Sequence, residues 1–227
     1  MDERSFPDAE ARANLSRGIS DNAIYRMVEI ALQKRLPQRS GVLIDVGCGA
    51  GGLWNALQKH FSEYIGVDAV KYAGFPANLR FCKVELNTGR SELPDNSGDV
   101  VAAVETIEHL ENPRALAREL ARLAKPGGWI VITTPNQLSF ASVACLLLKN
   151  CFQHFQEGGD GGYPTHLSAL LEIDLKRIAR ENSLTDISIE YSNTGRIPFT
   201  SWHWPRMWPF RGRRFSDNLM VTGRKGP

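Results

Sequence analysis

Short apolar runs alternate with amphipathic stretches along the first part of the chain. The apolar runs predict strands at 42–46, 64–68, 79–84, 98–104 and 129–133. The stretch 113–124 has helical periodicity, begins with Pro113, which the first helical turn tolerates, and stops at Pro126. Because strands that alternate with helices must cross over between neighbours, this order predicts an α/β fold with a parallel, doubly wound sheet.

The stretch 8–36 is predicted to be helical. Its apolar stripe consists of Ile24, Met27, Val28, Ala31 and Leu32. Ser20 or Asp21 can cap this helix, which must stop before Pro37. We expect residues 1–38 to form a helical cap on a single domain that covers residues 1–227.

Two segments in the second half of the chain are longer than a minimal α/β fold needs. Residues 172–182 predict a helix, and 184–191 and 217–223 predict strands, which leaves 136–166 and 192–216 as long connections. Long loops in compact domains are usually functional or disordered. Since both segments are rich in Phe, Trp, Leu and Tyr, we interpret them as ordered insertions on the substrate side. The alternative is that their apolar residues only extend the core.

The most informative stretch is 42–52, Val-Leu-Ile-Asp-Val-Gly-Cys-Gly-Ala-Gly-Gly. A buried strand is followed by a turn of small residues and then by a helix, which is how α/β folds bring backbone N–H groups close to a ligand. Gly47, Gly49 and Gly52 satisfy the dinucleotide pattern G-x-G-x-x-G, and Asp68 lies about 20 residues further on. Asp45 argues against a dinucleotide site, because an apolar residue is usual at that point of the strand.

Three motifs in order resemble the class I S-adenosylmethionine-dependent methyltransferases. They are Asp45-Val46-Gly47-Cys48-Gly49-Ala50-Gly51, Gly66-Val67-Asp68 and Lys125-Pro126-Gly127-Gly128-Trp129-Ile130-Val131-Ile132. The resemblance is close over about residues 40–135. It implies a Rossmann-like sheet of seven strands, mostly parallel, with helices on both faces and an antiparallel hairpin at the C-terminal edge.

The resemblance also implies S-adenosyl-L-methionine as the cofactor. In the family, the first motif holds the methionine part of the cofactor and the acid of the second motif takes the ribose hydroxyls. Glu85 or Asn87 would lie near the adenine, although the family usually has Asp there. The implied cofactor-binding residues are Asp45, Gly47, Cys48, Gly49, Asp68, Glu85, Leu86 and Glu105.

The fourth predicted strand ends in Glu105-Thr106-Ile107-Glu108-His109, where the family usually places catalytic residues. The methyl group of a sulfonium is already electrophilic, so the enzyme must align the acceptor and remove a proton from its hydroxyl group. One hypothesis is that Glu105 contacts the cofactor, Glu108 binds a backbone group and His109 only orients the loop. A second makes His109 the general base, with an adjacent Glu holding its tautomer.

A third hypothesis is a metal site. Glu-x-x-Glu-His resembles the cluster of metal-dependent small-RNA 2′-O-methyltransferases and of some ubiquinone-pathway O-methyltransferases, which use a further His after the fifth strand. His166 occupies a comparable place, so Glu105, Glu108, His109 and His166 would bind Mg²⁺ or Mn²⁺. The predicted catalytic residues are accordingly Glu108, His109 and His166. His60 and His154 have no evident partner in the sequence, which is typical of surface or helix histidines.

An aromatic and basic stretch, 202–214, contains three tryptophans and four arginines. Aromatic faces stack on sugars or bases and arginines bind phosphates, while the same mixture suits a membrane interface. It is also compatible with an aromatic edge of the core. The later segments, among them Tyr163-Pro164-Thr165-His166 and Gly195-Arg196-Ile197-Pro198, resemble methyltransferases of bacterial surface-polysaccharide and lipid-linked glycan pathways.

The composition fits an ordinary globular protein. The 227 residues carry a formal net charge of +2, so nucleic acid is not expected as a partner. The four cysteines form no Cys-x-x-Cys pair, the N-terminus lacks a signal peptide's apolar core, and no apolar run is long enough to cross a bilayer. We therefore expect a cytoplasmic protein, with peripheral contact to the inner face of the membrane as an option.

The predicted activity is O-methylation of a hydroxyl group on a sugar or lipid-linked glycan. The alternatives are a quinone-pathway or RNA 2′-hydroxyl methyltransferase, a non-catalytic module that binds the cofactor, and a dehydrogenase that would bind a nicotinamide nucleotide instead.

Overall fold

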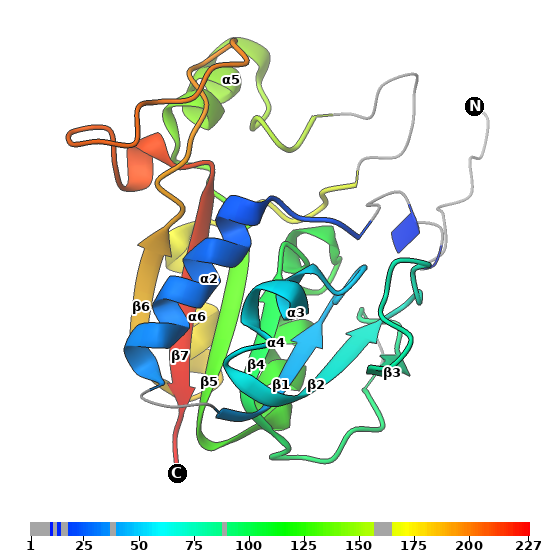
Figure 1. The fold of residues 1–227 in the computed structure, drawn as a ribbon. Coiled ribbons are helices and arrows are strands. Elements are labelled where there is room, and N and C mark those ends of the chain that lie inside the picture. The colour runs from blue at the N-terminus through cyan, green and yellow to red at the C-terminus, as the bar shows by residue number, and fades with distance from the viewer. Residues whose placement is uncertain (1–9, 11–12, 15–17, 37–39, 88–89, 157–164) are drawn as a thin grey trace.

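The computed structural model describes residues 10, 13–14, 18–36, 40–87, 90–156 and 165–227 (Figure 1). Its centre is one seven-stranded sheet with the strand order β3-β2-β1-β4-β5-β7-β6. The strands are β1 (Ser40–Val46), β2 (Phe61–Asp68), β3 (Arg80–Lys83), β4 (Gly98–Val104), β5 (Ala124–Pro135), β6 (Leu184–Tyr191) and β7 (Asn218–Lys225). Strands β1 to β5 pair in parallel, and β7 is antiparallel to both β5 and β6. The predicted doubly wound sheet with an antiparallel C-terminal edge is thus confirmed.

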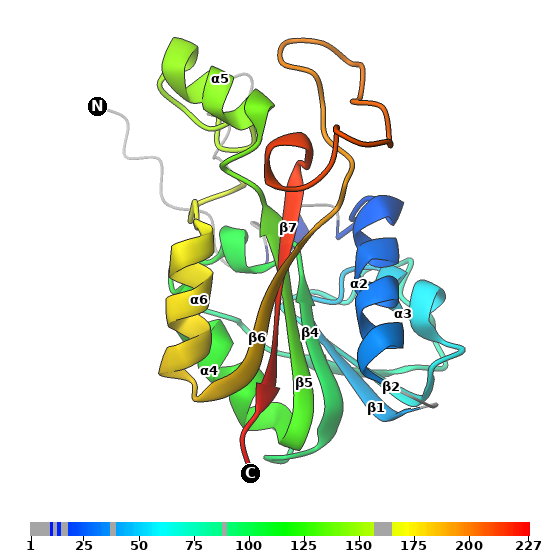
Figure 2. The ribbon, with the colours of Figure 1, turned by 90° about the vertical axis from the view of Figure 1, so that its left-hand side faces the viewer.

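Helices cover both faces of this sheet (Figure 2). Helices α2 (Asn22–Arg35) and α3 (Gly52–Leu57) pack on one face, and α4 (Pro113–Leu123) and α6 (Glu172–Glu181) pack on the other. Strand β4 supplies both layers, because its side chains alternate: Val101 and Ala103 join the α4–α6 core, while Val100 and Ala102 join the α2–α3 core. Burial on both faces explains the continuous apolar runs in the sequence.

Helix α2 starts later than the predicted stretch 8–36. Its N-cap is Asp21, whose carboxylate accepts a hydrogen bond from the N–H of Ala23 at 2.7 Å. The preceding residues, 18–21, are not helical, and the carbonyl of Gly18 accepts a hydrogen bond from the N–H of Ala50 at 3.0 Å. The segment therefore lies against the glycine turn instead of extending α2. Most of the predicted cap before residue 18 falls outside the described residues.

Strand β5 also begins earlier than predicted. Ala124 pairs with Gly98, and the register then shifts before Trp129 pairs with Val100. The residues of the Lys125–Gly128 turn motif form the irregularity between these two pairs, so the helix before them ends at Leu123.

A lobe rises above the carboxyl ends of the parallel strands (Figures 1 and 2). We define it as residues 138–156 and 192–216. It contains α5 (Phe140–Lys149), a helix that the sequence analysis left as part of a long connection. The hydroxyl of Ser139 caps α5 by accepting a hydrogen bond from the N–H of Ser142 at 3.1 Å, and Asn150 ends it in a left-handed conformation.

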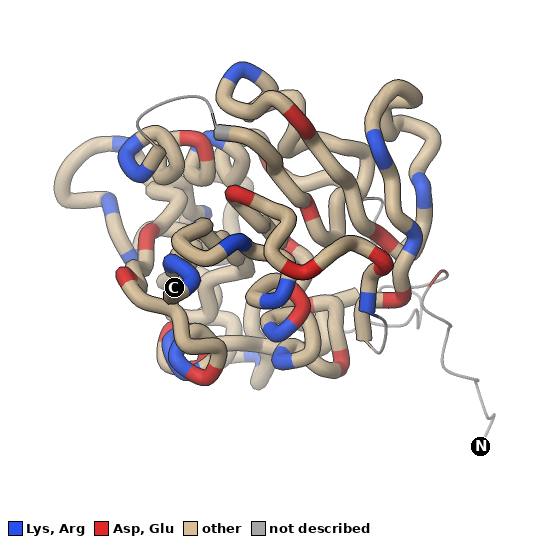
Figure 3. The backbone as a smooth tube through the Cα atoms, turned by 90° about the horizontal axis from the view of Figure 1, so that it is seen from below, with Lys and Arg blue, Asp and Glu red and all other residues tan. Residues whose placement is uncertain are grey.

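The opposite end of the molecule has a mixed charge pattern. Seen from the amino ends of the parallel strands, Lys and Arg segments are interspersed with Asp and Glu segments (Figure 3). In the part of the chain that the structure describes, no helix is both long enough and apolar enough to span a membrane.

Candidate active site

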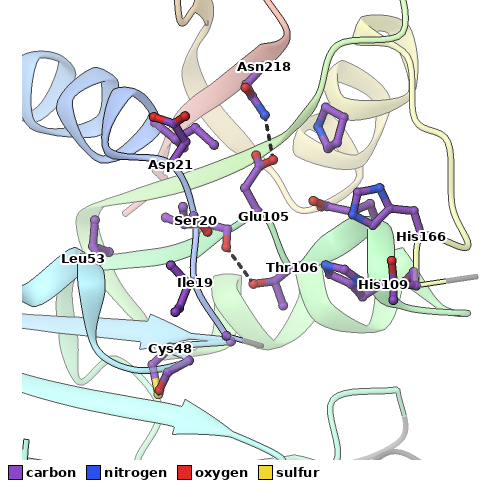
Figure 4. A pocket seen from close by; sticks show the side chains of 18 of the residues that line it. Ile19, Ser20, Asp21, Cys48, Leu53, Glu105, Thr106, His109, His166 and Asn218 are labelled. Atoms are coloured by element: carbon purple, nitrogen blue, oxygen red, sulfur yellow. Dashed lines mark hydrogen bonds between the residues drawn. The ribbon is translucent and has the colours of Figure 1, made fainter. Parts of the chain in front are cut away.

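A cavity with a volume of about 400 Å³ opens at the carboxyl ends of β1, β2 and β4, where open α/β sheets bind their ligands. All the predicted site residues line it: Asp45, Gly47, Cys48, Gly49, Asp68, Glu85, Leu86, Glu105, Glu108, His109 and His166. The fold therefore brings together residues that are more than a hundred positions apart in the sequence. Figure 4 shows part of this arrangement.

The floor of the cavity is the glycine turn after β1. Gly47 and Gly49 have φ values of +78° and +51°, which side chains rarely adopt. A Cβ atom on Gly47 would lie 2.2 Å from the Oγ1 atom of Thr106, and one on Gly49 would lie 2.2 Å from the carbonyl oxygen of Gly18. The turn is therefore closely packed on both sides, and glycine is required for space as well as for conformation.

Two acids flank this turn. The carboxylate of Asp68 accepts hydrogen bonds from the N–H groups of Gly49 at 2.9 Å and Ala69 at 2.7 Å, and burial raises its pKa. Asp45 accepts a hydrogen bond from the hydroxyl of Tyr64 at 2.7 Å on one oxygen, while its other oxygen is buried without a hydrogen-bond partner among the described residues. Burial, reinforced by the charge of Asp68, raises the pKa of Asp45 to about 7.

The shifted pKa of Asp45 makes the stability of the ligand-free protein depend on pH. The folded state keeps a proton on Asp45 between pH 3.8 and about 7, where the unfolded chain has lost it. The contribution of protonated Asp45 to the free energy of unfolding is complete below pH 3.8 and is lost as the pH rises through about 7. Asp45→Asn should therefore increase the free energy of unfolding at pH 8 by on the order of a few kcal/mol and raise the melting temperature. This gain should shrink towards pH 5.

Melting curves at several pH values check this expectation. Asp186→Asn is the control, because Asp186 is exposed on β6, away from the cavity lining. A gain for Asp45→Asn that is the same at pH 5 and pH 8 would contradict the pKa argument.

Glu85 and Asn87, the two polar residues predicted to lie near the adenine, contact each other. One carboxylate oxygen of Glu85 accepts a hydrogen bond from the N–H of Asn87 at 2.9 Å. The side-chain oxygen of Asn87 accepts a hydrogen bond from the N–H of Glu111 at 2.8 Å. Asn87 therefore stabilises the loop before α4 in this structure, and Glu85 and Leu86 line the cavity.

One wall of the cavity is formed by residues that were not predicted from the sequence. Ile19, Ser20 and Asp21, which precede α2, line it together with Tyr25, and the hydroxyl of Tyr25 accepts a hydrogen bond from the N–H of Ser20 at 3.3 Å. Only the capping residues before α2 marked this segment in the sequence. Its place beside the glycine turn depends on the long-range bond to Gly18, which no local pattern encodes.

Glu105, at the end of β4, is held tightly by its neighbours. The Thr133 hydroxyl donates to one of its carboxylate oxygens at 2.9 Å, and the Asn218 side-chain amide donates to the other at 2.7 Å (Figure 4). Its φ of +50° is uncommon for a residue with a side chain and marks local strain, which is typical of functional sites. Burial raises its pKa to about 7.

Glu108 lies deeper. It is completely buried, and neither carboxylate oxygen has a hydrogen-bond partner among the described residues. Burial is the main reason that its pKa is raised well above the usual value, and the charge of Glu105 adds to the shift. A buried carboxyl group without partners needs either a proton or a bound cation.

Within the described part of the chain, Glu108, His109 and His166 form the one group of potential metal ligands. One ligand atom of each lies within 4.8 Å of the others. Glu105, the fourth residue of the predicted metal set, is not in this group, because its carboxylate is turned to Thr133 and Asn218. The rings of His109 and His166 meet edge to face with their centroids 4.7 Å apart.

The tautomer of His109 follows from one contact. Its Nδ1 atom lies 2.6 Å from the carbonyl oxygen of Thr165, which only accepts hydrogen bonds, so Nδ1 carries the proton and Nε2 has the free lone pair. The second hypothesis had an adjacent Glu hold the tautomer of His109; in the structure the carbonyl of Thr165 does so. Burial lowers the pKa of His109 and, together with the nearby histidines, that of His166 to about 4. Both rings are therefore neutral at pH 7.

The lobe adds residues that the motifs did not indicate. His154 lines the cavity, its ring centroid lies 6.4 Å from that of His166, and its Nε2 atom is buried without a hydrogen-bond partner among the described residues. It is thus not the surface residue that the sequence suggested. Arg196 and His203 line the same side. His60, in contrast, lies beside Glu29 on the surface, at 3.4 Å.

A glycine turn between two acids, in a sheet of this strand order, defines a Rossmann-like methyltransferase fold. Residues 21–189, well over half of the chain, match a family model described as a methyltransferase domain. The chain belongs to this family, the class I S-adenosylmethionine-dependent methyltransferases. The resemblance stated from the three sequence motifs is thereby confirmed.

Curated relatives share part of their length with this chain. It is 31% identical over 105 residues to a ubiquinone biosynthesis O-methyltransferase of Albidiferax ferrireducens, covering 42% of this chain and 41% of that protein. It is 35% identical over 157 residues to a protein of the same name from Nitrosospira multiformis, covering 63% and 62%. The chain thus spans about half the length of the curated relatives it matches.

Solved structures show the same fold over most of the chain. A methyltransferase from Archaeoglobus fulgidus, described as S-adenosylmethionine-dependent, superposes with a TM-score of 0.61 at 20% sequence identity. The match covers 88% of this chain and 94% of that one.

Proposed function

We propose that the protein transfers the methyl group of S-adenosyl-L-methionine to a hydroxyl oxygen of a lipid-linked acceptor. The observation that carries this proposal is the group Glu108, His109 and His166, which opens into the same cavity as the glycine turn. A hydroxyl is a weak nucleophile until its proton is removed, so a group that can take the proton or lower its pKa beside the cofactor suits O-methylation.

The cofactor half of the cavity has the groups that a charged nucleoside needs. The unpaired oxygen of Asp45 would bind the ammonium of the methionine part, while the backbone of Gly47, Cys48 and Gly49 approaches the ligand. Asp68 would take the ribose hydroxyls, and Glu85 and Leu86 would flank the adenine. A cationic ligand also favours the ionised form of Asp45, whose pKa is raised in the empty cavity.

The acceptor half of the cavity, which contains Glu108, His109 and His166, supports two versions of proton removal. In the first, the Nε2 atom of His109 accepts the acceptor's proton directly, with Thr165 holding the ring. In the second, Glu108, His109 and His166 hold Mg²⁺ or Mn²⁺. The two orphaned oxygens of Glu108 and the buried, unpartnered Nδ1 of His166 fit this version. When bound, such an ion lowers the pKa of an acceptor hydroxyl.

Two acceptor classes remain as proposals. The names of the curated relatives favour a phenolic hydroxyl of the quinone pathway. The resemblance of the later segments to glycan-pathway enzymes favours a sugar hydroxyl on a lipid-linked glycan. An RNA 2′-hydroxyl is less favoured, because the names of the curated relatives point to a quinone pathway instead.

A methyl-transfer screen tests the proposal. The protein is incubated with S-adenosylmethionine labelled on the methyl group and, in turn, with lipid-linked phenols, lipid-linked glycans and RNA. We expect labelled methyl ether in one of the lipid-linked pools. Labelling of RNA alone would overturn the lipid-linked acceptor, and cofactor binding without transfer to any pool would leave a binding module.

Arg196 should affect the acceptor and not the cofactor. It lines the cavity on the lobe side, and its guanidinium forms no ion pair or hydrogen bond with the described residues, so it is free to bind a polar or anionic group of the acceptor. We expect Arg196→Ala to raise the KM for the acceptor about tenfold or more, the loss of one charge-assisted hydrogen bond, with unchanged cofactor affinity.

Steady-state kinetics and calorimetry separate the two effects. Arg118→Ala is the matched control, since Arg118 is exposed on α4, away from the cavity lining. A change in cofactor affinity for Arg196→Ala, with unchanged acceptor KM, would contradict the assignment.

A further inference from the structure

Exposed apolar side chains are concentrated in the lobe. Among the described residues, eleven large hydrophobic side chains are exposed, and eight of them belong to the lobe: Phe140, Leu146, Leu147, Leu148, Phe199, Trp202, Met207 and Trp208. Leu147, Leu148, Trp202 and Trp208 are 74–85% exposed. Single exposed apolar residues are normal in soluble proteins, whereas a group of this size indicates a binding surface.

These side chains project from a packed base. Phe140, Trp204, Phe210 and Phe215 form an aromatic cluster in which Trp204 stacks on Phe210 at 5.5 Å and Phe140 meets Phe215 at 5.1 Å. This cluster joins α5 to residues 204–215. Trp204, Phe210 and Phe215 are half-buried in this cluster, while Phe140 is 38% exposed.

Two contacts link the segments 138–156 and 192–216 of the lobe. The ammonium of Lys149, at the end of α5, lies 5.7 Å from the ring centroid of Phe199 in the second segment. The guanidinium of Arg214 lies 5.8 Å from the ring centroid of Phe140. Cations therefore stand directly beside the apolar side chains, which is the mixture found where proteins meet lipid headgroups.

The lobe is also strongly polarised in charge. Its two segments contain six of the 27 Lys and Arg residues of the chain and none of the 25 Asp and Glu residues. The rest of the chain therefore has 21 basic residues against 25 acidic ones, a net charge of −4, while the lobe carries +6. The near-neutral total thus conceals a positive excess in these two segments, although Glu172 of α6 lies 3.8 Å from Arg213. The opposite end of the molecule is mixed in sign (Figure 3).

We propose that this lobe docks the protein on an anionic lipid bilayer. Trp202, Trp208, Leu147 and Leu148 would enter the interfacial region, and the arginines would bind the lipid phosphates. Aliphatic side chains such as Leu147 and Leu148 do not stack on bases, so nucleic acid fits less well. A second copy of the chain fits poorly too, because two surfaces of charge +6 would repel each other.

The place of the lobe connects docking to the cavity. His154, Arg196 and His203 belong to the lobe and also line the cavity, so a bilayer against the lobe would lie next to the acceptor half. This last step rests on the proposed function: a lipid-linked acceptor would enter the cavity from the membrane without leaving it. The docking itself does not depend on which acceptor is used.

Vesicle flotation with the full chain tests the proposal. The probes are phosphatidylcholine vesicles alone and vesicles with about one third phosphatidylglycerol, at low and high salt. We expect binding to the anionic vesicles, weakened by salt, and at least about tenfold weaker binding to the neutral ones. Trp202→Ser with Trp208→Ser, and separately Leu147→Ser with Leu148→Ser, should each weaken the binding to anionic vesicles about tenfold or more.

Two controls keep the result specific. Ile30→Ser with Ile173→Ser removes exposed apolar side chains outside the lobe and should leave binding unchanged. Anionic vesicles should shift the tryptophan emission of the wild type to shorter wavelength, and Trp202→Phe with Trp208→Phe should remove most of this shift. Melting curves confirm that the variants fold.

Several results would overturn the docking proposal. They are no binding to anionic vesicles, equal binding by the serine variants, tighter binding to an RNA oligonucleotide, or a dimer in solution that the tryptophan substitutions dissociate. Because flotation requires neither cofactor nor acceptor, vesicle binding without methyl transfer would count only against the proposed function, and methyl transfer without vesicle binding only against docking.

Discussion

Gly49→Ala is expected to remove measurable binding of S-adenosylmethionine. The new Cβ atom would lie 2.2 Å from the carbonyl oxygen of Gly18, at a φ of +51°. Left-handed backbone alone costs about 1–2 kcal/mol for a residue with a side chain, close to a tenfold loss of affinity if the turn must keep this shape to bind. The clash with Gly18 adds to this, because either the glycine turn or the wall before α2 has to move.

Gly212→Ala is the matched control. Gly212 also has a positive φ, +80°, but a Cβ atom there meets nothing within 4 Å. Alanine at Gly212 is also strained, because the φ of +80° and ψ of −161° favour glycine, but it causes no clash. Gly212 lies outside the cavity lining, so the cofactor affinity of Gly212→Ala should equal that of the wild type. Calorimetry with S-adenosylmethionine and with NAD, alongside melting curves, decides the outcome. Normal affinity in Gly49→Ala, or binding of NAD in place of S-adenosylmethionine by the wild type, would refute the proposed cofactor site.

The second large effect is expected at His109. His109→Ala should lower kcat by about 10²–10⁴-fold with little change in cofactor affinity, because both versions of proton removal use its free Nε2 atom. Since burial lowers the pKa of His109 from its usual 6.5, the wild-type rate should begin to fall only below pH 6.5, where the ring becomes protonated. His60→Ala, at a surface histidine paired with Glu29, should keep the wild-type kcat.

Chelation then separates the two versions. With a bound ion, exhaustive chelation should stop turnover and Mg²⁺ or Mn²⁺ should restore it. Glu108→Gln, His166→Ala and His109→Ala should then be severe and non-additive, since each would break one unit. Full activity in protein shown to be metal-free would exclude the ion and leave His109 as the direct base. A kcat near the wild-type value in His109→Ala would contradict both versions.

The residues predicted to bind the cofactor could be expected to lie together, because their determinants are local. Asp45, Gly47 and Gly49 follow one another across a strand and its turn, and Asp68 ends the next strand. The carboxyl ends of adjacent parallel strands necessarily meet at one edge of the sheet, so the prediction of neighbouring parallel strands was enough to bring these residues together. The apolar runs identified the strands, because strands buried on both faces need continuous hydrophobic sequence.

The acceptor half depended on contacts that no local pattern encodes. The tautomer of His109 is set by the carbonyl of Thr165, 56 residues away, and Glu105 is turned from the other acids by Asn218, 113 residues away. His154 lines the cavity from the lobe above the carboxyl ends of the strands, and α5 in this lobe was missed although Ser139 provides its cap.

The sequence by itself therefore determined the fold and the family of this protein. Tertiary structure alone decided which acids and histidines share a pocket, which carboxylates lack partners, and which aromatic residues are packed or displayed. Trp204 and Trp208 illustrate the reason. Both tryptophans precede a proline in the same loop, but Trp204 stacks on Phe210 inside the lobe while Trp208 is 85% exposed. Burial is a property of long-range packing, and a local sequence pattern carries little information about it.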